Sequence, residues 1–329
     1  MSLANNKLIK LLGIATPIIG APMAGASGGY ITAEQIQKEI EVARQAFGSD
    51  SQLPLRIGVG FLCWRLERDE AQGEKELNVA LDSHVTAIWL SFGEKLPKWI
   101  QQVRDHDRAN GRKTIIFVQV PSAEDALVAS RDWKVDVIVA QAFILMPGIE
   151  AGGHGFGNAP SMKSLITSIL SIIPEDGPSV VGAGGLATGK DVAELLSLGA
   201  AGAVLGTRFL LTPESLYSDS HKQALVVAES TTSVRSMAFD QARDTLGWPS
   251  GVDGRGLRNA TVDDYEKGED IQVLRSKFQE AARNNDVSRA IVWAGTGVGD
   301  MRSIKPAREL VQELNQECLA YLQSNAVQP

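Results

Sequence analysis

The chain has 329 residues, of which 44% are hydrophobic and 22% are charged. These proportions match globular proteins and exclude a disordered chain. The net charge of −7 argues against nucleic acid or a membrane surface as a partner, because both attract basic proteins.

The N-terminal region contains an apolar stretch that resembles an export signal or a membrane span. No charged residue occurs between Leu11 and Ala33, and Lys7 and Lys10 precede this stretch. Seven glycine and proline residues interrupt it, and these residues weaken any continuous helix. We therefore expect a buried strand followed by a glycine-rich loop.

Short apolar runs recur through the first two thirds of the chain. They do not alternate with polar residues, which is typical of strands buried on both faces of a parallel sheet. The predicted strands are Pro17–Met23, Leu55–Phe61, Thr86–Phe92, Thr114–Val120, Val135–Gln141, Ser179–Gly185 and Gly202–Phe209.

Helical patterns lie between these strands. Thr32 and Gln35 have the spacing of a capping box that opens an amphipathic helix over residues 32–47. Thr188 can cap a later helix that stops at Gly199. Alternating strands and helices predict an α/β fold.

The number of strands indicates a TIM-type (β/α)8 barrel that lacks one strand, because such a barrel has eight and the sequence supplies seven. We expect this barrel over residues 1–210 and a mostly helical C-terminal extension, packed on it, over residues 211–329. Closure requires every strand to pair on both sides. The missing strand therefore bears on whether the barrel closes.

The cysteines indicate a reducing compartment. Cys63 and Cys318 are the only two, and they form neither a disulfide framework nor a metal-binding spacing. We expect a cytoplasmic protein without a metal.

Two glycine-rich segments indicate a phosphorylated ligand. Gly182–Gly185 (GAGG) and Gly206–Arg208 (GTR) follow neighbouring predicted strands, where barrels of this type often bind phosphate. Glycine lets backbone N–H groups approach an anion, and the N-terminus of the following helix adds a favourable dipole. Strand-to-helix turns also need glycine, so the prediction depends on the two segments together.

A third segment supplies a titratable group. His154 lies in Gly148–Gly155 (GIEAGGHG), which we expect to be a flexible loop after the strand that ends at Gln141. Histidine exchanges protons near neutral pH, so we expect a role in the site. Glu150 either orients His154 or is an ordinary loop carboxylate.

Together these segments resemble the nitronate monooxygenase family, whose members are FMN-dependent barrels. The matching segments are PIIGAPMAGASGG (17–29), VIVAQ (137–141), GIEAGGHG (148–155), VVGAGGLATG (180–189), AGAVLGTRF (201–209), TLGWPSGVDGRGLRN (245–259) and VWAGTGVG (292–299). The combination of EAGGHG with GAGG and GTRF is specific.

The resemblance implies a set of residues around FMN. The ring system would contact Ala21, Pro22, Met23, Gln141 and Gly152. The phosphate would be held by Gly184, Gly185, Gly206 and Thr207. His154 would match the active-site histidine, which deprotonates nitroalkanes in some members and contacts the anionic substrate in others. The implied reaction is oxidation of an alkyl nitronate, or a nitroalkane, by O2 to a carbonyl compound and nitrite.

One departure from the family concerns the barrel. Gly29 runs directly into Tyr30, where the family has a helix and the second barrel strand. Without that second strand, residues 17–23 and 55–61 should either pair directly in a distorted barrel or flank a gap. Such a gap would lie beside residues 21–23, so we expect weakened FMN binding.

A second departure concerns the spacing of the site. Residues 142–147 (AFILMP) separate Gln141 from Gly148, which are adjacent in the family, and this insert bears on the distance from Gln141 to His154. In addition, Gly60 occurs where the family often has asparagine.

Two other functions fit the sequence. A flavin-dependent enoyl reductase would share the barrel and a similar glycine–histidine loop, and NAD(P)H would reduce its flavin. A non-catalytic, truncated member would fail to bind FMN, as the missing strand and the insert suggest. If only the phosphate loops are considered, a barrel without flavin also fits.

Overall fold

The structure, a computed structural model, describes residues 3–23, 32–50, 53–141, 151–157 and 160–326. The Gly29–Tyr30 junction, the insert at 142–147 and Glu150 lie outside the described residues.

Within the described residues, seven parallel strands form one curled sheet of the TIM-barrel type, one strand fewer than the usual eight. Their order across the sheet is β1-β8-β7-β5-β4-β3-β2. The strands are β1 (Ile18–Gly20), β2 (Leu55–Leu62), β3 (Val85–Ser91), β4 (Ile115–Val120), β5 (Val137–Gln141), β7 (Ser179–Ala183) and β8 (Gly202–Leu205). Each predicted apolar run overlaps a strand of the sheet, so the predicted sheet is confirmed.

The sheet is open between β1 and β2. These are its two outer strands, and within the described residues no backbone pairing joins them. The alternative in which they flank a gap is therefore confirmed. The chain after β1 does approach β2 at the carboxyl end of the sheet, because a Cβ added at Gly60 would lie 2.7 Å from the Cβ of Pro22.

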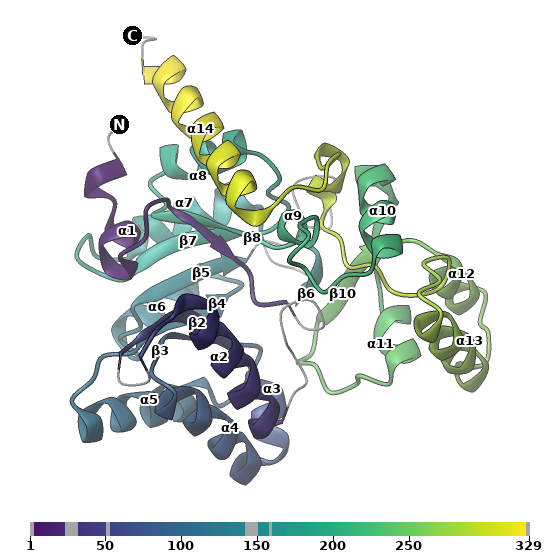
Figure 1. Cartoon of the computed structure of the whole chain (residues 1–329), viewed down its shortest axis with the longest axis horizontal. Helices are drawn as coiled ribbons and strands as arrows, with labels where there is room; N and C mark the ends of the chain where they lie inside the picture. The colour runs from purple at the N-terminus through teal and green to yellow at the C-terminus, as the bar shows by residue number, and fades with distance from the viewer. Residues whose placement is uncertain (1–2, 24–31, 51–52, 142–150, 158–159, 327–329) are drawn as a thin grey trace.

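Helices cover the outer face of this sheet (Figure 1). The helices that precede β8 in the chain are η1 (Leu3–Asn5), α1 (Lys7–Leu12), α2 (Ala33–Phe47), α3 (Cys63–Arg68), α4 (Glu70–Asp82), α5 (Leu96–Asn110), α6 (Ala123–Arg131), α7 (Met162–Ile172) and α8 (Gly189–Ser197). The capping box that opens α2 is confirmed, since Thr32 accepts from the backbone of Gln35 and the Gln35 side chain accepts from the backbone of Thr32.

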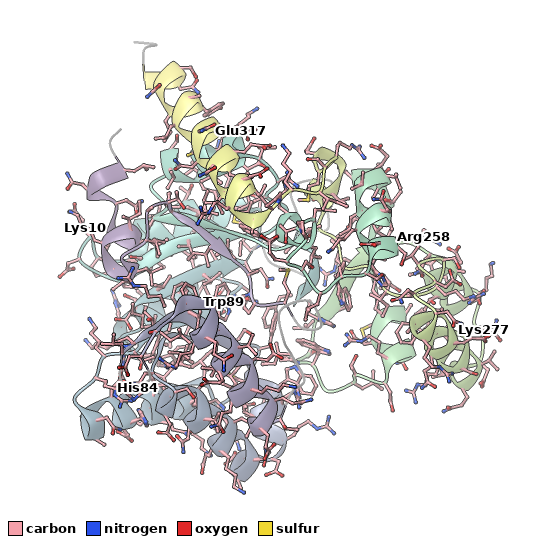
Figure 2. All side chains as sticks on the ribbon, viewed as in Figure 1. Lys10, His84, Trp89, Arg258, Lys277 and Glu317 are labelled. Atoms are coloured by element: carbon pink, nitrogen blue, oxygen red, sulfur yellow. The ribbon has the colours of Figure 1, made fainter. Side chains whose placement is uncertain are left out.

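Alternate residues of the strands build two apolar layers. Ile88 and Val118 face the helices, whereas Trp89 and Phe117 face the barrel interior. Figure 2 marks Trp89, whose ring stacks on Phe117 with centroids 5.6 Å apart. Leu8 of α1 is fully buried in the same interior cluster, so the first helix packs into the barrel.

A second, antiparallel sheet lies beside the barrel. It has the order β6 (Gly153–Phe156), β10 (Val252–Leu257) and β9 (Ser233–Ser236). We expected a flexible loop around His154. This prediction is wrong for the described residues 151–157, because Gly153–Phe156 form β6. Strands β9 and β10 lie within residues 211–329, which we expected to be mostly helical.

The remaining helices are α9 (Thr207–Leu210), α10 (Asp219–Val227), η2 (Ser230–Thr232), α11 (Ala238–Arg243), α12 (Ala260–Glu266), α13 (Ile271–Arg283), η3 (Thr296–Asp300) and α14 (Ala307–Ala326). Helices α11, α12 and α13 group at the end of the molecule away from α1, while α14 returns to pack on α8 (Figure 1). A domain boundary at residue 210 stays a prediction. None of the described helices combines the length and apolar character needed to span a membrane.

Candidate functional site

A cavity of about 760 Å³ is located at the carboxyl ends of the strands. All the residues expected around a flavin line it, together with the expected active-site histidine. They are Ala21, Pro22, Met23, Gln141, Gly152, His154, Gly184, Gly185, Gly206 and Thr207. The structure thus brings together residues that lie far apart in the sequence, while the role of each stays a prediction.

The register of the strands explains this clustering. Ala183 on β7 lies opposite Val204 on β8, so residues 184–185 and 206–207 leave adjacent strand ends. Because β1 pairs with the other side of β8, residues 21–23, which come directly after β1, lie next to these two loops. Loops from three neighbouring strands therefore meet at one edge of the sheet.

The loop after β7 depends on glycine for its backbone conformation. Gly184 has φ 134° and Gly185 has φ 66°, values that residues with a side chain rarely adopt. In addition, a Cβ at Gly184 would lie 3.0 Å from the Cβ of Ala151. The GAGG motif thus lets the backbone make a tight turn against the strand that carries His154.

The N-terminus of α8 is already capped by protein groups. Asp191 Oδ2 accepts from the backbone N–H groups of Ala187 and Thr188, at 2.9 and 2.8 Å. Glu317 Oε2 accepts from Gly189 N at 2.8 Å, and Figure 2 shows Glu317 on α14. The two carboxylates therefore occupy the first amides of this helix, and the expected contribution of its dipole to anion binding stays a prediction.

The segment around η3 closes the site from the C-terminal side. Gly295 N donates to Thr207 Oγ1 at 3.0 Å. A Cβ at Gly152 would lie 2.4 Å from Gly295 N, and one at Gly297 would lie 2.1 Å from the carbonyl oxygen of Gly185. The glycines of the VWAGTGVG motif thus allow the two backbones to approach closely.

His154 is paired with a buried carboxylate. Its Nε2 lies 2.9 and 3.0 Å from Asp240 Oδ1 and Oδ2, and Thr245 Oγ1 donates to Asp240 Oδ1 at 2.8 Å. Asp240 is 0% exposed and the His154 side chain is 9% exposed. A carboxylate only accepts hydrogen bonds, so Nε2 carries a proton and Nδ1 is the ring atom left for another partner.

Aromatic rings fix the plane of this imidazole. Trp248 stacks on it with centroids 3.7 Å apart and planes 11° apart, and Trp293 lies at 5.1 Å. The neighbouring strand carries Gly254, where a Cβ would lie 2.7 Å from the Trp293 ring. The histidine is therefore held in one orientation by packing as well as by its hydrogen bond.

Gln141 contacts His154 directly, despite the insert that follows it in the sequence. Its Nε2 donates to the carbonyl oxygen of His154 at 3.3 Å, and its Oε1 accepts from Gln119 Nε2 at 2.6 Å. The insert therefore leaves these two residues in contact, and Gln141 lines the cavity.

Comparisons with known proteins agree with this arrangement. The family model for nitronate monooxygenase matches residues 62–317. The chain belongs to the nitronate monooxygenase family. Members of this family are flavin-dependent oxidoreductases.

Two family members illustrate the extent of the similarity. A nitronate monooxygenase from Neurospora crassa is 36% identical over 209 residues, which cover 62% of this chain and 53% of that protein. This alignment therefore spans about half of the relative's length. Nitronate monooxygenase npaC from Metarhizium robertsii is 29% identical over 335 residues, which cover 95% of this chain and 88% of that protein.

Two solved structures have the same fold as this chain. FabK from Thermotoga maritima has a TM-score of 0.77 at 20% identity, covering 98% of this chain and 99% of FabK. A nitroalkane oxidase from Streptomyces ansochromogenes has a TM-score of 0.74 at 24% identity, covering 97% and 99%.

Several residues that line or support the cavity were not predicted as site residues. Trp248 and Trp293 lie in segments that match the nitronate monooxygenase family, so the resemblance could have pointed to them. Nothing in the sequence around Asp240 marks it as the partner of a distant histidine. Tyr217 also lines the cavity, and burial raises its pKa, so its hydroxyl keeps the proton near neutral pH.

Proposed function

We propose that this chain is an FMN-dependent nitronate monooxygenase that oxidises alkyl nitronates, and nitroalkanes, with O2. In this reaction the C–N bond breaks, the carbon gains oxygen and the nitrogen leaves as nitrite. The observation that carries the proposal is the Asp240–His154 pair, which lies in the same cavity as the two glycine loops. A proton-accepting group and a place for an anionic cofactor are thus combined in one site.

The residues present suit an aromatic, phosphorylated cofactor. Gly184 and Gly185 expose backbone without a side chain, and a Cβ at Gly206 would meet no atom closer than 3.6 Å. The indole N–H groups of Trp89 and Trp248 are buried and lack a partner within the described part of the chain, although both residues line the cavity. Buried donors usually have an acceptor, which a ring system with nitrogen and oxygen atoms would supply.

FMN, when bound, would accept electrons from the substrate and pass them to O2. Its phosphate would be held by backbone N–H groups of residues 184–185 and 206–207, with the hydroxyl of Thr207 beside them. Its ring would lie along residues 21–23 and Gly152, and Gln141 would donate to it. These assignments follow the family resemblance and the shared lining of the cavity.

His154 would handle the proton and the charge of the substrate. Because Asp240 holds the proton on Nε2, the lone pair of the neutral ring is on Nδ1, which can take the α-proton of a nitroalkane. As imidazolium, the same ring would attract a nitronate anion. The stacked Trp248 limits rotation of the imidazole ring, so the orientation of Nδ1 would stay fixed during the reaction.

The test is nitrite release by the purified chain after loading with FMN. We expect nitrite from alkyl nitronates in air and a slower release from the parent nitroalkanes. Reduction of the bound flavin by NAD(P)H, without nitrite from any nitronate, would support the enoyl reductase instead. A protein that stays colourless after incubation with FMN would support the non-catalytic alternative.

Asp240→Asn tests whether the carboxylate positions His154. Asparagine can present either an oxygen or an N–H to Nε2, so the ring is no longer forced to keep its lone pair on Nδ1. We expect the rate on nitroalkanes to fall by about 10²-fold, the low end of what a positioned general base contributes. The rate on preformed nitronates, which have already lost the proton, should fall less.

The matched control for this variant is Asp253→Asn. Asp253 lies on β10 of the second sheet, where it pairs with Arg235 and not with His154. Equal losses on nitroalkane and nitronate in Asp240→Asn would show a structural role for the carboxylate and contradict the positioning role.

A further inference from the structure

The cavity extends beyond the candidate site along the free edge of β2. This part, which we call the apolar arm, lies between β1, β2 and helix α2. It is lined by Leu12, Ile14, Ile36, Ile40, Ala43 and Gly58. The arm exists because the sheet is open, since within the described residues neither outer strand pairs on that side.

Apolar side chains at this edge remain partly uncovered. Ile18 on β1 and Ile57 and Val59 on β2 are only partly buried, whereas Ile88 and Val118 on the inner strands are fully buried. Covering such surface with an apolar group is favourable. The arm therefore offers a surface that suits a hydrocarbon chain.

The arm is continuous with the site that holds His154, because both belong to one cavity. Pro22 and Gly60, which pack against each other, both line this cavity. From Gly60 back to Arg56, β2 extends over roughly 13 Å at about 3.3 Å per residue. Glu39 and Arg56 also line this part, but both are exposed, so they lie at the rim.

We infer that the arm binds the alkyl chain of the substrate, which makes nitronates with extended, unbranched alkyl chains the substrate class. The inference rests on the proposed function for the head group. The polar nitronate would lie near His154, and the chain would follow the free edge of β2 toward α2. A closed barrel would fill this space with a strand, so the preference is a property of the open sheet.

The first test compares nitronates of nitroethane, nitrobutane and nitrooctane. Each methylene that enters the arm should raise kcat/KM by up to about fourfold, the factor that corresponds to burial of one CH2 group. The ratio of kcat/KM for the octyl and ethyl compounds then measures the contribution of the arm to activity. The value for the ethyl compound alone measures the activity of the site without that contribution. A ratio near one in the unaltered protein would overturn the inference.

Gly58→Leu places a side chain inside the arm. A Cβ at Gly58 would lie 3.5 Å from the Cβ of Ala87, an ordinary contact, and the rest of the leucine would occupy the cavity. We expect the octyl-to-ethyl ratio to fall at least tenfold relative to Gly58→Ala, which adds only that Cβ. Ala43→Leu fills the arm from α2 and should lower the ratio in the same way.

Binding of simple alcohols separates this inference from the proposed function. Octanol should bind more tightly than butanol by up to about fourfold per methylene, and Gly58→Leu should remove the difference while Gly58→Ala keeps it. Trp89 lines the cavity, so its fluorescence can report binding. Chain-length-dependent binding without nitrite release would contradict only the proposed function. Equal binding of both alcohols would contradict the arm.

Discussion

Gly185→Asp is expected to abolish retention of FMN. Gly185 has φ 66° and lies in the loop that we assign to the phosphate, so the substitution adds backbone strain and a negative charge. Like charges about 4 Å apart repel by about 4 kcal/mol at an effective dielectric constant near 20. The Kd for FMN, measured by fluorescence titration, should therefore rise by about 10³-fold.

Two controls separate charge from strain in this experiment. Gly111→Asp introduces the same residue at φ 62°, in a helix cap with open space around it, far from the cavity lining. Riboflavin, which lacks the phosphate, should lose much less affinity for Gly185→Asp than FMN does. Equal FMN affinity in Gly185→Asp and Gly111→Asp would contradict the phosphate assignment.

His154→Asn is expected to keep FMN and to lose activity. The role that we propose for His154 is toward the substrate, and loss of a positioned proton acceptor typically costs about 10²–10⁴-fold in rate. The loss should be largest with nitroalkanes. With preformed nitronates it should be smaller, because only the attraction between imidazolium and anion is removed.

His106→Asn is the matched control, because His106 Nε2 lies 2.9 Å from Asp82 Oδ1 on the protein surface. This second histidine–aspartate pair does not line the cavity within the described residues. If His154→Asn lowers the rates on nitroalkane and nitronate by similar factors, His154 binds the substrate but does not accept its proton. An unchanged rate on both would remove His154 from the site.

The sheet could be predicted because its signals are local. Each parallel strand is a continuous apolar run between glycine-rich turns, as in VIVAQ at 137–141, and burial on both faces requires that pattern. The open edge of the sheet could also be predicted, because the sequence has no apolar run for another strand between the segments that form β1 and β2. Placement of both glycine loops at one edge follows from parallel topology alone.

The second sheet and the partner of His154 could not be predicted in this way. Strand β10 contains Gly254 and Gly256 instead of an apolar run, because Trp293 and the carbonyl of Val292 occupy the space that side chains would need. Asp240 lies 86 positions from His154. Such tertiary contacts leave no periodic signal in a single sequence.

The proposed oxidation of nitronates requires a flavin bound at the carboxyl edge of the open sheet. The most direct test is to mix the FMN-loaded protein with an alkyl nitronate in the absence of O2 and to follow the absorbance of oxidised flavin. We expect this absorbance to fall, and to return with release of nitrite when O2 is admitted. A flavin spectrum that stays unchanged with nitronates, but is lost on addition of NADPH, would contradict the proposal.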